Sequence, residues 1–152
     1  MRNKRKWLTV LLCAIVMFTG CTKAEEDSFT VRIALECEGD VYAIRYMYSL
    51  GSLEIDGGAI VGQDGKPLEQ DEGEIVFTLD DFDGRKDLSE FNIMMYIIDE
   101  PVSYNDWTDL IGRGTPAAGQ IAFDPIMGRE YTITVNGEEG SYWLGYDKNR
   151  NP

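Results

Sequence analysis

The chain has 152 residues, enough for one domain, and 43% of them are hydrophobic, which is typical of a folded globular protein. It carries 27 acidic residues against 14 basic ones, a net charge of −13, and has no histidine. The negative charge disfavours nucleic-acid binding. Without histidine, neither a Ser-His-Asp nor a Cys-His catalytic mechanism can be assembled within the chain.

The N-terminus has the layout of an export signal. A basic start, Met1 to Lys6, precedes an apolar run from Trp7 to Phe18, which at 12 residues is too short to span a bilayer as a helix. The sequence from Phe18 through Gly20 to Cys21 resembles a bacterial lipobox, although leucine is usual where Phe18 stands. The resemblance implies cleavage after Gly20 and lipid attachment at Cys21. An ordinary cleaved signal and an uncleaved anchor are the alternatives.

This reading divides the chain into four parts: a lipoprotein signal peptide (1–20), a lipidated N-terminus and tether (21–28), a β-sandwich domain (29–148) and a C-terminal tail (149–152). Four of the 14 basic residues precede Cys21 and all 27 acidic residues follow it, so the mature chain has a net charge of −17. Cys37 is the single cysteine inside the domain. With Cys21 lipidated it has no disulfide partner, and its place on an apolar strand face predicts an inert packed thiol.

Alternating apolar and polar residues predict short strands along the whole domain, separated by turn signals. The predicted strands cover residues 29–37, 42–49, 53–61, 75–79, 91–98, 121–123, 131–135 and 142–146. The stretch 91–98 is apolar on both faces, which predicts a central, well-covered strand whose Met94 and Met95 fill the core. Asp56-Gly57-Gly58 inside the third strand suggests a bulge or a turn.

Seven or eight strands with little helix predict an all-β fold, an antiparallel β-sandwich of immunoglobulin-like or transthyretin-like type. A small closed β-barrel is the alternative. The turn Gly128-Arg129-Glu130-Tyr131 before an alternating strand resembles the tyrosine corner of Greek-key sandwiches. The long connection 99–119 carries Trp107, which we expect to seal one end of the sandwich from a short helical turn.

Aromatic side chains are the candidate ligand-binding residues. Tyr42, Tyr46 and Tyr48 alternate along one strand, so they form either the edge of the core or a ligand platform. Trp107 and Trp143 are the candidates for stacking on a sugar ring.

The acidic segment 80–90 has some of the residues of a calcium-binding loop. With Gly84 at the sixth position, Asp81, Asp83 and Glu90 take the third, fifth and twelfth positions. Leu79 then takes the first position, where a ligand is required, so an EF-hand is rejected. A looser calcium site on the same three carboxylates is the alternative to a plain acidic turn.

The sequence contains no phosphate loop, CxxC, HExxH or GxSxG motif, so we expect no catalytic residues, no enzymatic activity and no cofactor. The leading expectation is a non-catalytic lipoprotein of the bacterial cell envelope, anchored to the membrane by lipid, whose domain faces the periplasm or the exterior. Its expected partner is another envelope protein. A surface glycan bound by exposed aromatic rings is the second hypothesis, and a basic protein bound by the acidic surface is the third.

Overall fold

The computed structural model describes residues 27–70, 73–102 and 110–147. Nine strands and two short 3₁₀ turns make up these residues. In chain order they are β1 (Ser28–Cys37), β2 (Ala43–Leu50), β3 (Leu53–Val61), η1 (Gln63–Gly65), β4 (Gly73–Thr78), η2 (Leu79–Phe82), β5 (Phe91–Ile98), β6 (Thr115–Pro116), β7 (Ile121–Phe123), β8 (Glu130–Glu138) and β9 (Ser141–Tyr146). No helix among the described residues is long and apolar enough to cross a membrane.

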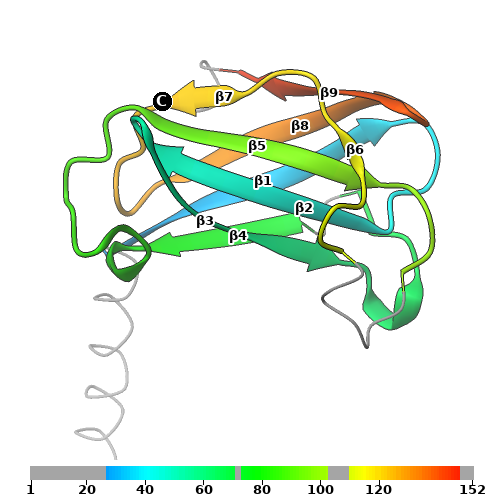
Figure 1. Cartoon of the computed structure of the whole chain (residues 1–152), viewed down its shortest axis with the longest axis horizontal. Coiled ribbons are helices and arrows are strands. Elements are labelled where there is room, and N and C mark those ends of the chain that lie inside the picture. The colour runs from blue at the N-terminus through cyan, green and yellow to red at the C-terminus, as the bar shows by residue number, and fades with distance from the viewer. Residues whose placement is uncertain (1–26, 71–72, 103–109, 148–152) are drawn as a thin grey trace, which may run out of the picture.

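The strands form two sheets stacked face to face, so the predicted β-sandwich is confirmed and the barrel is wrong (Figure 1). Sheet A has the order β4-β1-β8-β9, and sheet B has the order β3-β2-β5-β6 with β7 also paired to β5. All neighbours pair antiparallel except β1 and β8, which run parallel. Fully antiparallel pairing was expected. The chain leaves sheet A after β1, returns for β4, which pairs antiparallel with one edge of β1, and returns again for β8, which pairs parallel with the other edge.

The core lies between the sheets and is dominated by aromatic rings at one end. Phe29 of β1 stacks on Phe77 of β4 with ring centroids 4.9 Å apart, and meets Phe91 of β5 edge-on at 5.4 Å. Phe91 in turn contacts Phe123 of β7 at 5.2 Å. These rings join sheet A to sheet B, and such pairs contribute beyond the apolar area that they bury.

Two local features correct the sequence prediction. The fourth strand ends at Thr78 instead of Leu79, because the Asp81 carboxylate accepts hydrogen bonds from the Thr78 backbone N–H and hydroxyl at 2.7 and 2.8 Å and turns the chain into η2. In β3 the pairing passes from Tyr48↔Asp56 to Ser49↔Glu54, so the bulge lies at Ile55, and Gly57 stays in the ladder.

The tyrosine corner is present. The hydroxyl oxygen of Tyr131, the second residue of β8, accepts a hydrogen bond of 2.8 Å from the Ile126 N–H five residues upstream. The ring is buried. This bond fixes the turn that returns the chain from sheet B to sheet A.

The connection from β6 to β7 closes one side of the sandwich. Ala117 N–H donates to the carbonyl oxygen of Met95 in sheet B, while Ala118 exchanges two backbone hydrogen bonds with Tyr142 and Leu144 of β9 in sheet A. Figure 1 shows this yellow segment running from β5 to the side of β9. It pairs with edge groups of both sheets at once, which reduces the unpaired edge that each would otherwise present.

Part of the outer face of sheet B is covered. Val102 and Leu110, from the long connection after β5, pack on Ala43 of β2 and Ile98 of β5 in a second, smaller apolar cluster. The cover therefore protects one end of the β2–β5 pair. The outward side chains further along the two strands lie beyond it.

Candidate functional site

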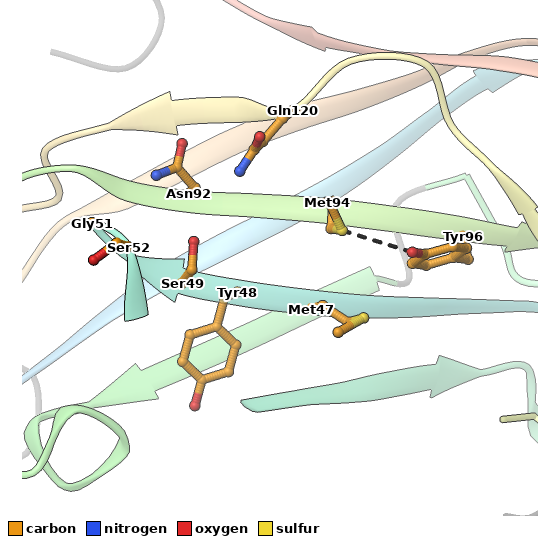
Figure 2. A pocket seen from close by; sticks show the side chains of 9 residues that line it. All are labelled: Met47, Tyr48, Ser49, Gly51, Ser52, Asn92, Met94, Tyr96 and Gln120. Carbon is orange, nitrogen blue, oxygen red and sulfur yellow. Dashed lines mark hydrogen bonds between the residues drawn. The ribbon is translucent and has the colours of Figure 1, made fainter. Parts of the chain in front are cut away.

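The outer face of sheet B holds an open pocket of about 410 Å³ beyond the covered end. Its floor is the β2–β5 pair, and Gln120 borders it from the β6–β7 connection (Figure 2). We call it the β2–β5 pocket, and it is lined by Met47, Tyr48, Ser49, Gly51, Ser52, Asn92, Met94, Tyr96 and Gln120. None of these residues is charged, in a chain where acidic residues outnumber basic ones by 27 to 14.

Three successive cross-strand pairs lie on this face. Antiparallel register places Ser49 opposite Asn92, Met47 opposite Met94 and Arg45 opposite Tyr96. Because side chains alternate along a strand, the residues between them on β2 and β5 point into the core. The six outward side chains are all half-buried. Along the strands, the face therefore presents first the hydroxyl and amide of Ser49 and Asn92, then two thioethers, and finally a cation beside an aromatic ring.

Arg45 holds the apolar end of the pocket in place. Its guanidinium carbon lies 3.9 Å from the centroid of the Tyr96 ring, a cation–π contact, and its Nη1 donates to the Met47 sulfur at 3.7 Å. The Tyr96 hydroxyl donates to the Met94 sulfur at 3.8 Å (Figure 2). The Nε of Arg45 is buried and has no hydrogen-bond partner among the residues that the structure describes. Both thioethers are thus fixed by weak hydrogen bonds from groups on the same face.

At the polar end, Asn92 is oriented by its own strand. Its Nδ2 donates to the backbone carbonyl of Glu90 at 2.8 Å, a carbonyl that also accepts from the Gly51 N–H at 3.0 Å. Glu90 has a left-handed backbone with φ of 64°, and its N–H donates to Asp124 Oδ1 at 2.9 Å. This bond uses one N–H of the Asn92 amide and orients the group, which leaves its carbonyl oxygen as an acceptor and its second N–H as a donor.

The three predicted tyrosines do not form an exposed platform. Tyr48 is 6% exposed and meets Phe77 edge-on at 5.0 Å, and the half-buried Tyr46 meets the same ring at 6.3 Å. Tyr42 packs beside the second apolar cluster under the cover. The alternation was predicted correctly, but Tyr46 and Tyr48 lie on the core face of β2. The outward face carries Arg45, Met47 and Ser49.

Trp143 lies on the opposite side of the molecule from the β2–β5 pocket. It is 51% exposed on the outer face of sheet A, in β9 opposite Asn136 of β8. The neighbouring Gly145 is close to the side chains of Thr134 and Asn136, where a Cβ atom would overlap them. The other predicted sugar-stacking residue, Trp107, lies outside the described residues, as do Gly20 and Cys21.

The three carboxylates of the calcium-site alternative, Asp81, Asp83 and Glu90, form no metal-binding group in the described part of the chain. The Asp81 carboxylate accepts hydrogen bonds from Thr78, the N-cap residue of η2, while Asp83 and Glu90 are exposed. Within the described part of the chain, no group of three or more Cys, Asp or Glu side chains is placed to hold a metal ion.

Two titratable side chains near the other end of the core are shifted by burial. Desolvation raises the pKa of the Cys37 thiol, which is half-buried against the core. Burial, followed by the hydrogen bond to Asp99, raises the pKa of Tyr142 well above its usual range. The Tyr142 hydroxyl donates to Asp99 Oδ2 at 2.9 Å and so ties β9 to the residue after β5. A raised thiol pKa leaves Cys37 protonated at neutral pH and therefore a poor nucleophile.

No family model, no curated protein and no solved structure matches this chain.

Tyr48 borders the pocket although its ring packs on Phe77 in the core, and the other pocket residues were missed, although the sequence carries a signal for them. Met94 was predicted to fill the core together with Met95, but only Met95 is buried there, and Met94 lies on the outer face. A strand that is apolar on both faces, as 91–98 is, indicates that something covers its second face. In this structure the cover reaches Ile98 but not Met94.

Proposed function

We propose that this chain is a non-catalytic lipoprotein of the bacterial cell envelope whose sandwich binds another protein through the β2–β5 pocket. The observation that carries the proposal is the composition of the pocket. Its lining has no charged side chain, and it combines two methionines and a tyrosine backed by an arginine. Methionine, tyrosine and arginine are enriched at the centres of protein–protein interfaces, where aspartate, glutamate and lysine are depleted.

The rigidity of the site also supports binding. Its side chains project from two paired central strands, and Arg45, Tyr96 and Glu90 restrain them by the contacts described above. A pre-organised site loses less conformational entropy on binding than a loop does. The methionines keep some adaptability, because a thioether side chain fits varied apolar shapes.

The anchor is proposed on the sequence alone, from the basic start, the short apolar run and the lipobox-like residues before Cys21. Metabolic labelling with a fatty acid tests it. We expect label on the wild-type protein and none on Cys21→Ala, with the variant released from the membrane fraction. Label retained in Cys21→Ala would contradict the anchor.

The interaction is tested by crosslinking in intact cells, followed by purification of the protein from membranes. We expect a defined crosslinked partner with the wild-type chain and its loss in Met94→Lys, which places a charge in the pocket. The matched control is Val76→Lys, which places the same charge on the outer face of sheet A, where Val76 is 51% exposed. A partner recovered equally with both variants would contradict the proposal.

A second candidate function is glycan binding through Trp143, favoured by its half-exposed ring on the outer face of sheet A beside Asn136. An indole ring offers a flat apolar surface on which a sugar ring can stack. Soluble envelope polysaccharide should then bind the wild-type protein, and its affinity should be lower for Trp143→Ala. Met94→Lys should bind the polysaccharide as tightly as the wild-type protein does. The two variants therefore separate the two functions.

A further inference from the structure

We infer that the β2–β5 pocket takes an extended, uncharged segment of its partner that lies along β2 and β5 and is flanked by basic residues. The inference rests on the proposed function and names the partner's chemistry. It is carried by the spacing of the outward pairs, the chemistry of each pair and the distribution of charge.

The spacing of the floor matches that of an extended peptide. Outward residues on β2 and β5 recur every second position, which separates successive pairs by about 6.6 Å. An extended segment repeats its same-side side chains at that interval, whereas one turn of an α-helix advances about 5.4 Å and repeats at three and four residues. A strand-like ligand can therefore place alternate side chains over successive pairs.

The chemistry of the pairs then assigns the contacts. Met47 and Met94 form an apolar step that suits an aliphatic side chain. One pair along, the amide of Asn92 is oriented by its bond to the Glu90 carbonyl, so its side-chain carbonyl oxygen can accept a hydrogen bond from the ligand. At the other end, the Tyr96 ring provides an aromatic surface, and the Arg45 guanidinium that stacks on it holds it in place.

Charge decides the rest of the ligand. The lining holds no acidic side chain, and the neighbouring cation, Arg45, is stacked on Tyr96, so a basic residue at the centre of the segment would be desolvated without compensation, while an acidic one is disfavoured by the negative charge of the surface. Beside the pocket, the Leu50–Gly51 end carries Arg85 and Lys86 together with Asp87 and Glu90, a balanced set. The attraction for basic flanks therefore comes from the whole surface, whose mature net charge is −17.

The test is a selection from a random dodecapeptide library displayed on phage, against the full chain purified from membranes in detergent. We expect enriched peptides with an alternating, uncharged centre and lysine or arginine near the ends. Synthetic copies should bind the wild-type chain and Val76→Lys equally, and bind Met94→Lys at least about tenfold more weakly. Raising the salt concentration should weaken binding, because it screens the contribution of the flanks. Circular dichroism and urea unfolding of each variant check that the fold is retained.

Several results would overturn the inference: enriched peptides with apolar residues three and four apart, as in a helix, acidic enriched peptides, binding unaffected by Met94→Lys, or no enrichment at all. Its failure is distinguishable from failure of the proposed function. If Met94→Lys abolishes crosslinking to the cellular partner but no extended peptide binds, the protein-binding function stands and the extended ligand is wrong. If such peptides bind the pocket but crosslinking is unchanged in the variant, the proposed function is wrong.

Discussion

The hydroxyls of two buried tyrosines, Tyr131 and Tyr142, each fix a junction between segments. Tyr131 accepts from the Ile126 backbone N–H, and Tyr142 donates to Asp99. Both rings are buried, so neither hydroxyl exchanges freely with water. When such a hydroxyl is removed, its buried hydrogen-bond partner is left unsatisfied. The resulting loss of stability is larger than the net contribution of the hydrogen bond itself.

Tyr131→Phe tests the tyrosine corner. The substitution keeps the ring against Phe29 and Phe123 but leaves the part-buried Ile126 N–H without its acceptor. We expect the free energy of unfolding in urea to fall by about 1–3 kcal/mol. The control is Tyr146→Phe, because the Tyr146 hydroxyl makes no hydrogen bond within the described residues while its ring stacks on Phe123. Equal losses in the two variants would show that the corner bond contributes nothing.

Tyr142 gives the molecule a dependence on alkaline pH. Its pKa in the folded state is raised by burial and by Asp99, so the folded protein keeps the hydroxyl proton where the unfolded chain loses it. The stabilisation is complete below the unfolded value of 10.0 and declines as the pH rises beyond it. We expect Tyr142→Phe to be less stable at pH 7, since Asp99 loses its donor, and to lose stability less steeply above pH 10. Parallel stability curves of the two proteins above pH 10 would contradict this.

At the scale of elements, the β8–β9 hairpin depends on Gly137. This residue has φ of 119°, and a Cβ atom there would overlap the carbonyl oxygen of Ser141 across the hairpin. Gly140, with φ of 76°, has open space around the same position. We expect Gly140→Ala to cost about 1 kcal/mol, from the backbone alone, and Gly137→Ala to cost at least about 1 kcal/mol more. Thermal unfolding of both variants measures the difference, and a smaller loss in Gly137→Ala would refute the account.

The positions of the strands could be predicted because sequence period reports burial directly. All eight expected strands are present, because alternation marks the face that packs on the core, which in β3 is represented by the half-buried Ile60. The short β6 was missed: its two residues, Thr115 and Pro116, have no alternating pattern, and they pair with β5 only because the chain crosses from one sheet to the other there. The parallel β1–β8 pairing was missed for a related reason, because strand order depends on contacts distant in the sequence.

At the scale of the whole molecule, the candidate site could be predicted only in part. Alternation placed Met47 and Ser49 on the face opposite the tyrosines, but it did not say that this face would stay open. Openness depends on where the covering residues Val102 and Leu110 lie, and they lie over Ala43 and Ile98. Among the described residues, Trp143 is the predicted ligand residue that is exposed, because it lies on the outward side of β9. Which outer face is free is a property of the assembled sandwich.

The same division between the inner and outer faces of β5 predicts how the molecule unfolds. Ile97 and Ile98 are adjacent and both buried, but Ile97 lies in the core between the sheets and Ile98 lies under the cover on the outer face. Ile97→Ala should therefore lower the global unfolding free energy by about 2–5 kcal/mol, because the cavity opens where both sheets meet. The slowest-exchanging amides of β1, β8 and β5 exchange through global unfolding. Their hydrogen-exchange rates should therefore rise by the factor that corresponds to this loss of free energy.

Ile98→Ala should instead accelerate exchange mainly at Val102, Leu110 and the facing part of β2, since the cover can open while the two sheets stay packed. If Ile98→Ala destabilised β1 and β8 as much as Ile97→Ala does, the cover would be part of the main cooperative core, and the openness of the β2–β5 pocket could not be adjusted independently of the fold.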